Sequence, residues 1–192
     1  MMDTLRAYFF VFYLIGVAVL LVVTLSTATQ TDQGEKRPEG LRGVLPIVLA
    51  PAAWLLPPLV MFFRFGELDR AWSVVRLVGF GLSLYAAWML LLAPNTLGRF
   101  LVPRAVVFHD HELVTAGPYR TVRHPIYSGV LALWLGAALG TLNLLLLCLW
   151  PVIILAFSAE AGIGEDLLRS KFGPAYESYA KTTGRFVPRF SG

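Results

Sequence analysis

Four long stretches without a charged residue constrain the fold of this 192-residue chain more than any other feature. Three of them, residues 7–25, 43–63 and 77–98, match the roughly 20 residues that cross a bilayer as a helix. The composition is 57% hydrophobic and 15% charged, which is too apolar for an ordinary soluble domain. The sequence therefore predicts an all-α integral membrane protein.

The fourth uncharged stretch, residues 126–159, is too long for one upright helix at about 1.5 Å per residue. Residues 140–143, Gly-Thr-Leu-Asn, supply turn-forming side chains in its middle. The stretch is thus predicted to fold as a hairpin of 126–139 and 144–159, which brings the expected number of transmembrane helices to about five. The first stretch is interpreted as a membrane anchor, because its apolar core exceeds the ~7–15 residues of a cleaved signal peptide.

The basic residues predict how these segments are oriented. With five segments, the loops 31–42 and 99–124 and the residues after 159 share one side of the membrane. That side carries twelve of the sixteen Lys and Arg residues: three in the first loop, four in the second and five after residue 159. The positive-inside rule makes this side cytoplasmic, in a cytoplasmic or inner membrane, with the N-terminus outside. Anionic membrane lipids account for the basic charge, so no nucleic-acid partner is predicted.

The chain divides at residue 98. Residues 1–98 form a three-helix membrane scaffold, and residues 99–192 hold the polar motifs in a loop, a helical hairpin and an amphipathic tail. Pro174 suits the first turn of a tail helix. Leu168, Phe172, Tyr176 and Tyr179 form one apolar face if the helix axis continues across Gly173.

The polar cluster at residues 111–129 marks the candidate site. Pro125 favours a helix start just after His124, so free amides and the guanidinium groups of Arg120 and Arg123 could bind a carboxylate or phosphate. The alternative is that both arginines only anchor the protein to lipid headgroups. His109, His111 and His124 match no standard zinc spacing, and the single cysteine lies in an apolar segment, so no metal site is predicted.

Two separated motifs carry a family resemblance. The first reads Leu113-Val-Thr-x-Gly-Pro-Tyr-Arg-x-x-Arg-His-Pro-x-Tyr-x-Gly129, and the second reads Glu165-x-x-Leu-x-x-x-Phe-Gly-x-x-Tyr-x-x-Tyr179 followed by Arg185-x-x-Pro188. In this order they resemble the isoprenylcysteine carboxyl methyltransferase family, including its bacterial members and the related phospholipid methyltransferases. The resemblance covers about half of the chain, from residue 99 to residue 188.

The resemblance implies methyl transfer from S-adenosyl-L-methionine to a lipophilic or lipid-modified acceptor that arrives from the bilayer. The site would lie between loop 104–129 and the segment after residue 159. His124, Arg123 and Glu165 would be catalytic, with Glu165 meeting the amino group of the cofactor or standing beside the carboxylate that does. The residues that the resemblance assigns to the cofactor are His111, Glu112, Leu113, Val114, Tyr119, His124, Pro125, Ile126, Tyr127 and Glu165.

The chain departs from the family pattern at two positions. Glu160 stands where the family has arginine, and Gly164 stands where it has the first of two glutamates. The acceptor is therefore expected to be an isoprenylcysteine-like carboxylate or another lipid-like molecule, and the missing arginine argues against the first. A sterol-reductase-like enzyme that uses NAD(P)H is one alternative function. A degenerate, non-catalytic membrane protein that binds lipids or partners is the other.

Overall fold

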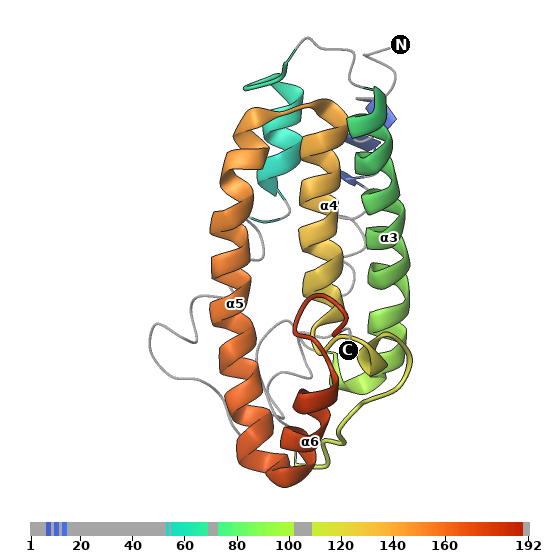
Figure 1. The fold of residues 1–192 in the computed structure, drawn as a ribbon, viewed down its shortest axis with the longest axis vertical. Coiled ribbons are helices and arrows are strands. Elements are labelled where there is room, and N and C mark those ends of the chain that lie inside the picture. Colours follow the sequence, from blue (N-terminus) through green and yellow to red (C-terminus); the bar gives the residue numbers. More distant parts are fainter. Residues whose placement is uncertain are drawn as a thin grey trace.

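A computed structural model describes the chain at residues 7–8, 10–11, 13–14, 53, 55–68, 73–101 and 109–189. Three long helices lie side by side and alternate in direction (Figure 1): α3 (Ser73–Leu97), α4 (Pro125–Thr141) and α5 (Leu144–Phe172). The short helices η2 (Gly98–Phe100), η3 (Gly117–Arg120) and α6 (Pro174–Thr182) lie at one end of these three. Within the described residues every regular element is helical, which confirms the predicted all-α class.

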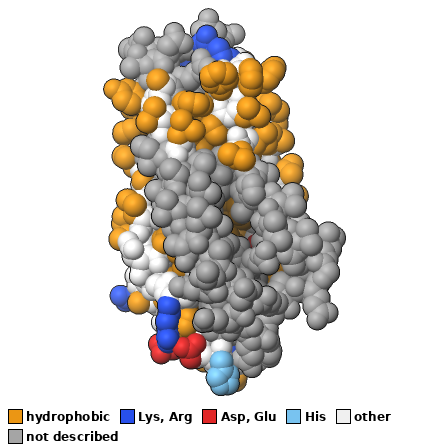
Figure 2. Space-filling view, turned by 180° about the vertical axis from the view of Figure 1, so that it is seen from behind, with side chains coloured by type: hydrophobic (Ala, Val, Ile, Leu, Met, Phe, Trp, Pro, Cys, Tyr) orange, Lys and Arg blue, Asp and Glu red, His pale blue; other side chains and the backbone are white. Residues whose placement is uncertain are grey.

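Two of these helices are long and apolar enough to cross a membrane, over Val74–Phe100 and Leu144–Phe172, and α4 is a shorter apolar helix between them. The predicted third segment lies in α3. Hydrophobic side chains cover much of the upper part of the face in Figure 2, and acidic and histidine side chains gather at its lower end. The predicted segments 7–25 and 43–63 lie mostly outside the described residues, although residues 55–62 are helical. Five transmembrane helices therefore stay a prediction.

The predicted hairpin in the fourth stretch is confirmed, because α4 ends at Thr141 and α5 begins at Leu144. Leu142 adopts a left-handed conformation with φ 53°, and its N–H closes the last turn of α4. Asn143 caps α5 through its side-chain oxygen, which accepts from the Leu146 N–H at 3.0 Å. Its side-chain amide donates to the Phe65 carbonyl at 2.8 Å. One asparagine thus turns the chain and ties the hairpin to the turn that follows the helix at residues 55–62.

Close packing of glycines joins α3 to α4. A Cβ atom added at Gly79 of α3 would lie 2.5 Å from the Gly140 nitrogen and 2.7 Å from the Gly136 carbonyl oxygen of α4. The backbones approach this closely because none of the three residues has a side chain. Deeper in the bundle, the fully buried Trp134 donates from Nε1 to the Ala53 carbonyl at 2.6 Å.

Gly173 separates α5 from α6 with φ 50° and ψ −123°. The helix axis therefore does not continue across Gly173, so Leu168 and Phe172 do not share one helix face with Tyr176 and Tyr179. The helix predicted from Pro174 is confirmed as α6. After α6 the chain returns to the start of α4, where the N–H groups of Arg123 and His124 donate to the carbonyls of Gly184 and Arg185 at 2.8 and 3.1 Å.

Candidate functional site

The entry to α4 is covered by the segment that follows α6. Besides the two backbone hydrogen bonds at residues 123 and 124, the Ser128 hydroxyl donates to the Phe186 carbonyl at 2.6 Å. The Arg123 guanidinium points inward and donates from Nη1 to the carbonyls of Ala180 and Thr183. The chain itself therefore uses the donors of Arg123 that were expected to bind an anion, whereas Arg120 is exposed.

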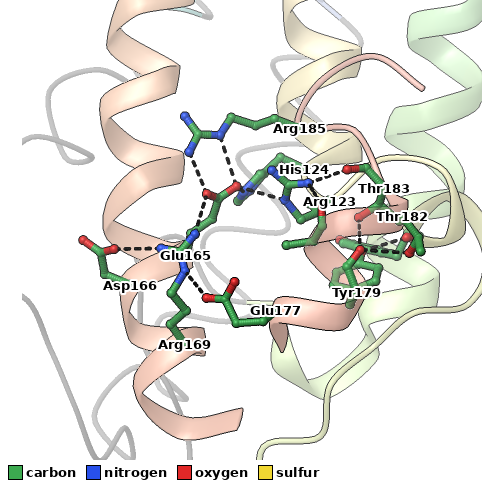
Figure 3. A network of polar contacts seen from close by, with 12 residues as sticks. Arg123, His124, Glu165, Asp166, Arg169, Glu177, Tyr179, Thr182, Thr183 and Arg185 are labelled. Atoms are coloured by element: carbon green, nitrogen blue, oxygen red, sulfur yellow. Dashed lines mark hydrogen bonds and ion pairs between the residues drawn. The ribbon is translucent and has the colours of Figure 1, made fainter. Parts of the chain in front are cut away.

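Glu165 lies at the centre of a polar network that joins three segments (Figure 3). Its side chain is 1% exposed. Oε1 accepts from Arg123 Nε at 3.1 Å and lies 3.2 Å from His124 Nε2. Arg185 donates to both oxygens, from Nε at 3.1 Å and from Nη2 at 2.6 Å. Both carboxylate oxygens are thus paired, and they hold the α4 entry and the segment after α6 against α5.

The protonation of His124 follows from its surroundings. Burial lowers the pKa of His124, and the positive charges of Arg123 and Arg185 act in the same direction, although the Glu165 carboxylate opposes them. The neutral imidazole then donates from Nε2–H to Glu165, which fixes the tautomer. Arg169, on the outer side of Glu165, pairs with Glu177 at 2.8 Å and with Asp166 at 3.1 Å.

A pocket opens beside this network. About 380 Å³ of space lies between its atoms, part of it open to solvent. Six residues from the predicted cofactor set line it: His111, Glu112, Leu113, Val114, Tyr119 and His124. Arg123, Leu97, Leu168, Tyr176 and Tyr179 complete the wall.

The other members of the predicted set lie elsewhere. Pro125, Ile126, Tyr127 and Glu165 are not part of the pocket lining. Tyr127 lies behind His124, with the two rings stacked at a centroid distance of 5.5 Å. Leu97, at the end of α3, is a lining residue that the sequence motifs did not indicate. Leu168, Tyr176 and Tyr179 all belong to the second sequence motif, and this is the signal that could have placed the three at the site.

Aromatic contacts and one hydrogen bond shape the pocket wall. The His111 ring stacks on Phe100 at 4.5 Å and meets the edge of Phe172 at 6.0 Å. The Tyr179 hydroxyl donates to the Tyr119 carbonyl at 2.7 Å, which ties α6 to η3. Burial raises the pKa of both tyrosines, so they present neutral rings and hydroxyls. The arrangement offers aromatic faces, aliphatic walls and a few polar groups to a ligand.

The sequence of this chain is similar to a known protein family and to several named proteins. Residues 74–175 match the sequence profile of the family described as phospholipid methyltransferase. A rice protein, from Oryza sativa subsp. indica, named probable protein-S-isoprenylcysteine O-methyltransferase, is 31% identical over 144 residues, which cover 73% of this chain and 75% of the relative. Protein-S-isoprenylcysteine O-methyltransferase of Tribolium castaneum is 37% identical over 89 residues, or 43% of this chain and 30% of the relative. The nickel-cobalt-cadmium resistance protein NccN of Alcaligenes xylosoxydans xylosoxydans is 39% identical over 85 residues, which cover 42% of this chain and 38% of the relative.

Proposed function

The chain belongs to the phospholipid methyltransferase family, within its isoprenylcysteine O-methyltransferase-like part, and from this premise we propose that it transfers a methyl group from S-adenosyl-L-methionine to a lipophilic acceptor. The pocket beside the Glu165 network would hold the cofactor. The observation that carries the proposal is that six residues of the cofactor set line this one pocket, together with side chains of α5 and α6.

The residues of the pocket suit the parts of this cofactor. Tyr119, Tyr176 and Tyr179, with the aliphatic side chains beside them, offer faces for an adenine ring. Glu112 is the carboxylate in the lining, so we assign it, rather than Glu165, to the amino group of the cofactor. Arg123 lies at the wall, and the guanidinium N–H groups that it does not donate to Glu165, Ala180 and Thr183 would be the donors for the cofactor's carboxylate.

Catalysis would rest on positioning. When bound, the cofactor supplies an electrophilic methyl group on a positively charged sulfur. The residues of the chain hold donor and acceptor in line and keep water out of the pocket. Glu165 fixes His124 and Arg123 from behind the pocket and is a positioning residue in this proposal. A carboxylate acceptor is already ionised near neutral pH and needs no general base, whereas an amine must first lose a proton.

The membrane arrangement is part of the proposal. Five transmembrane helices, with the N-terminus outside, would place the pocket and the basic segments on the cytoplasmic face. Residues 1–98 would serve as the scaffold and residues 99–192 would carry the site. The support is that residues 109–124 and α6, which belong to the segments predicted to face the cytoplasm, lie at the same end of the described helices (Figure 1).

Titration calorimetry of the solubilised protein tests the cofactor assignment. Wild type is expected to bind S-adenosyl-L-methionine and not NADPH. Glu112→Gln should weaken this binding about tenfold, because the amino group loses its ionic partner. Cys148→Ala, whose side chain is exposed on α5 away from the pocket, is the matched control and should bind as wild type does. Binding of NADPH alone would favour a reductase, and binding of neither by folded protein would favour a non-catalytic scaffold.

A further inference from the structure

Residues 109–116 form a strap along one side of the pocket. They belong to no helix or strand of the described chain, and they lie at the same end of the long helices as α6 (Figure 1). Four consecutive residues of the strap, from His111 to Val114, line the pocket. The strap is therefore a wall of the pocket that regular secondary structure does not support.

Two polar contacts on the exposed side hold the first residues of the strap. Arg99 of η2 pairs with Asp110 through Nη1 and Oδ2 at 2.8 Å, and both side chains are 62% exposed. Lys171, in the last turn of α5, donates from Nζ to the His109 carbonyl. Exposed ion pairs contribute little to stability, so these contacts break and re-form readily.

The His111 ring joins the strap to both neighbouring helices. It stacks on the Phe100 ring of η2 with the two planes 21° apart, and it meets the Phe172 ring at the end of α5 edge to face. Burial lowers the pKa of His111, and the positive charge of Lys171 acts in the same direction, although Asp110 opposes them. The ring is thus uncharged at neutral pH and packs as an aromatic group, with one face covered by Phe100.

The other end of the strap is fixed by close packing. The strap leads into Gly117, the first residue of η3, which has φ 54°. A Cβ atom at Gly117 would lie 2.9 Å from Thr96 Oγ1, so this close approach to α3 requires glycine. Two residues later, the buried Tyr119 is tied to α6 by the hydrogen bond from Tyr179. Opening of the strap would therefore begin at residues 109–111, where exposed contacts hold it.

We propose that the strap opens to exchange S-adenosyl-L-methionine and closes over it, and that the Arg99–Asp110 pair and the stacked His111 ring form the latch that holds it closed. His111 is then a positioning residue and not a direct ligand of the cofactor. A closed strap keeps water from the reacting groups, and its opening limits the rate of exchange. The identity of the ligand rests on the proposed function, whereas the motion of the strap can be tested without a ligand.

Rapid filtration with radiolabelled S-adenosyl-L-methionine measures association and dissociation rates on full-length protein in nanodiscs. Asp110→Asn weakens the latch with and without cofactor, so both rates should rise about two- to fivefold while Kd changes less than about twofold. Asp166→Asn is the matched control, because it also removes an exposed ion pair with an arginine and should leave both rates unchanged. Unchanged rates in Asp110→Asn, or the same acceleration in both variants, would overturn the proposal.

Two substitutions of His111 separate a positioning role from direct binding. His111→Ala removes the stack on Phe100 and should speed cofactor dissociation about fivefold. His111→Phe keeps an aromatic ring without ring nitrogens and should restore the wild-type rate. If a ring nitrogen of His111 bound the cofactor, His111→Phe would lose as much affinity as His111→Ala, and the positioning role would be wrong.

A cross-link tests whether exchange requires the strap to open. In a Cys148→Ser background, Arg99→Cys and Asp110→Cys joined by a short bis-maleimide keep the strap closed. Association of S-adenosyl-L-methionine should then slow about tenfold or more, relative to the same protein carrying two N-ethylmaleimide groups. Equal association rates in the two samples would contradict a strap that gates the pocket.

A thiol in the pocket wall reports strap opening without cofactor. Leu168 of α5 is half-buried and lines the pocket, so Leu168→Cys in the Cys148→Ser background should react with a maleimide about two- to fivefold faster when Asp110→Asn is added. If the reaction accelerates but wild type does not bind S-adenosyl-L-methionine, the strap stands as a lid and the proposed methyl transfer fails. If the cofactor binds but the reaction does not accelerate, the strap fails and the proposed function stands.

Discussion

At the scale of single residues, the buried carboxylate of Glu165 holds the segments of the candidate site together. Its carboxylate receives donors from Arg123, His124 and Arg185, which come from two segments on either side of it in the chain. Such a carboxylate has no free oxygen for a ligand. Glu165 is therefore expected to affect ligand binding indirectly, by fixing the positions of the side chains that pair with it.

Replacing Glu165 by Gln is expected to lower the free energy of unfolding by about 2–3 kcal/mol, because it leaves buried cationic groups without their counter-charge. The estimate is below that for a fully buried pair, since Arg185 is partly exposed. Denaturant unfolding in detergent measures the change. Asp166→Asn removes an exposed ion pair and should cost less than about 1 kcal/mol. Equal losses of unfolding free energy in the two variants would contradict the role of Glu165 as the centre of the polar network.

His124 makes stability depend on pH. Burial lowers its pKa in the folded protein below the unfolded value of about 6.5, so the fold favours the neutral ring. Unfolded protein then binds more protons, and stability should fall as the pH drops below about 6.5. Burial lowers the pKa of His111 too, so it contributes in the same direction. Thermal unfolding between pH 7.5 and 5.5 should show a smaller decline in His124→Gln than in wild type; an identical decline would refute the assignment.

At the scale of elements, the contact between α3 and α4 depends on missing side chains. Gly79 faces the backbone of α4 at Gly136 and Gly140, whereas Gly81, two residues further along α3, has no atom within 4 Å of the position where its Cβ would lie. The same substitution at the two sites thus has opposite consequences.

Gly79→Ala is expected to destabilise the protein by about 1–3 kcal/mol, because the new methyl group meets backbone atoms that can move only with the helix. Gly81→Ala should leave stability unchanged or raise it by up to about 1 kcal/mol, because alanine favours a helix over glycine. Comparing the two midpoints of thermal unfolding checks the prediction. A similar shift in both variants would show that the glycines do not set the helix spacing.

At the scale of the whole molecule, the described helices α3, α4 and α5 place different segments of the chain at their two ends. The turn at Asn143, which forms a bridge with Glu67, lies at one end together with Arg64, the ion-pair partner of Glu67, and α6 lies at the other end (Figure 1). α3 and α5 between them are long enough to span a bilayer by length and composition. If they do, the two ends face opposite compartments.

Cysteine labelling tests this arrangement. In a Cys148→Ser background, Arg64→Cys and Lys181→Cys each place one thiol at an exposed position. A membrane-impermeant maleimide applied to intact cells should label the first, and applied to inverted vesicles it should label the second, because the pocket end is proposed to face the cytoplasm. Labelling of both positions from the same side would contradict the membrane-spanning arrangement, and the reverse pattern would contradict only its orientation.

The sequence by itself determined the helical class, the hairpin and the start of the tail helix, because these depend on neighbouring residues. An uncharged stretch, the turn residues at 140–143 and the proline at 174 act over a few positions of the chain. The motifs also located six residues that line the pocket.

Only the tertiary structure decided which groups are paired. Glu165 meets partners 42, 41 and 20 positions away, whereas Glu160, five residues before it, meets no hydrogen-bond partner among the described residues. Gly173 has a left-handed φ and separates α5 from α6. Residues 168–179 therefore do not lie on one continuous helix, as their helical spacing had predicted. Pairing and burial depend on where distant segments meet in space, and spacing along the chain does not contain that information.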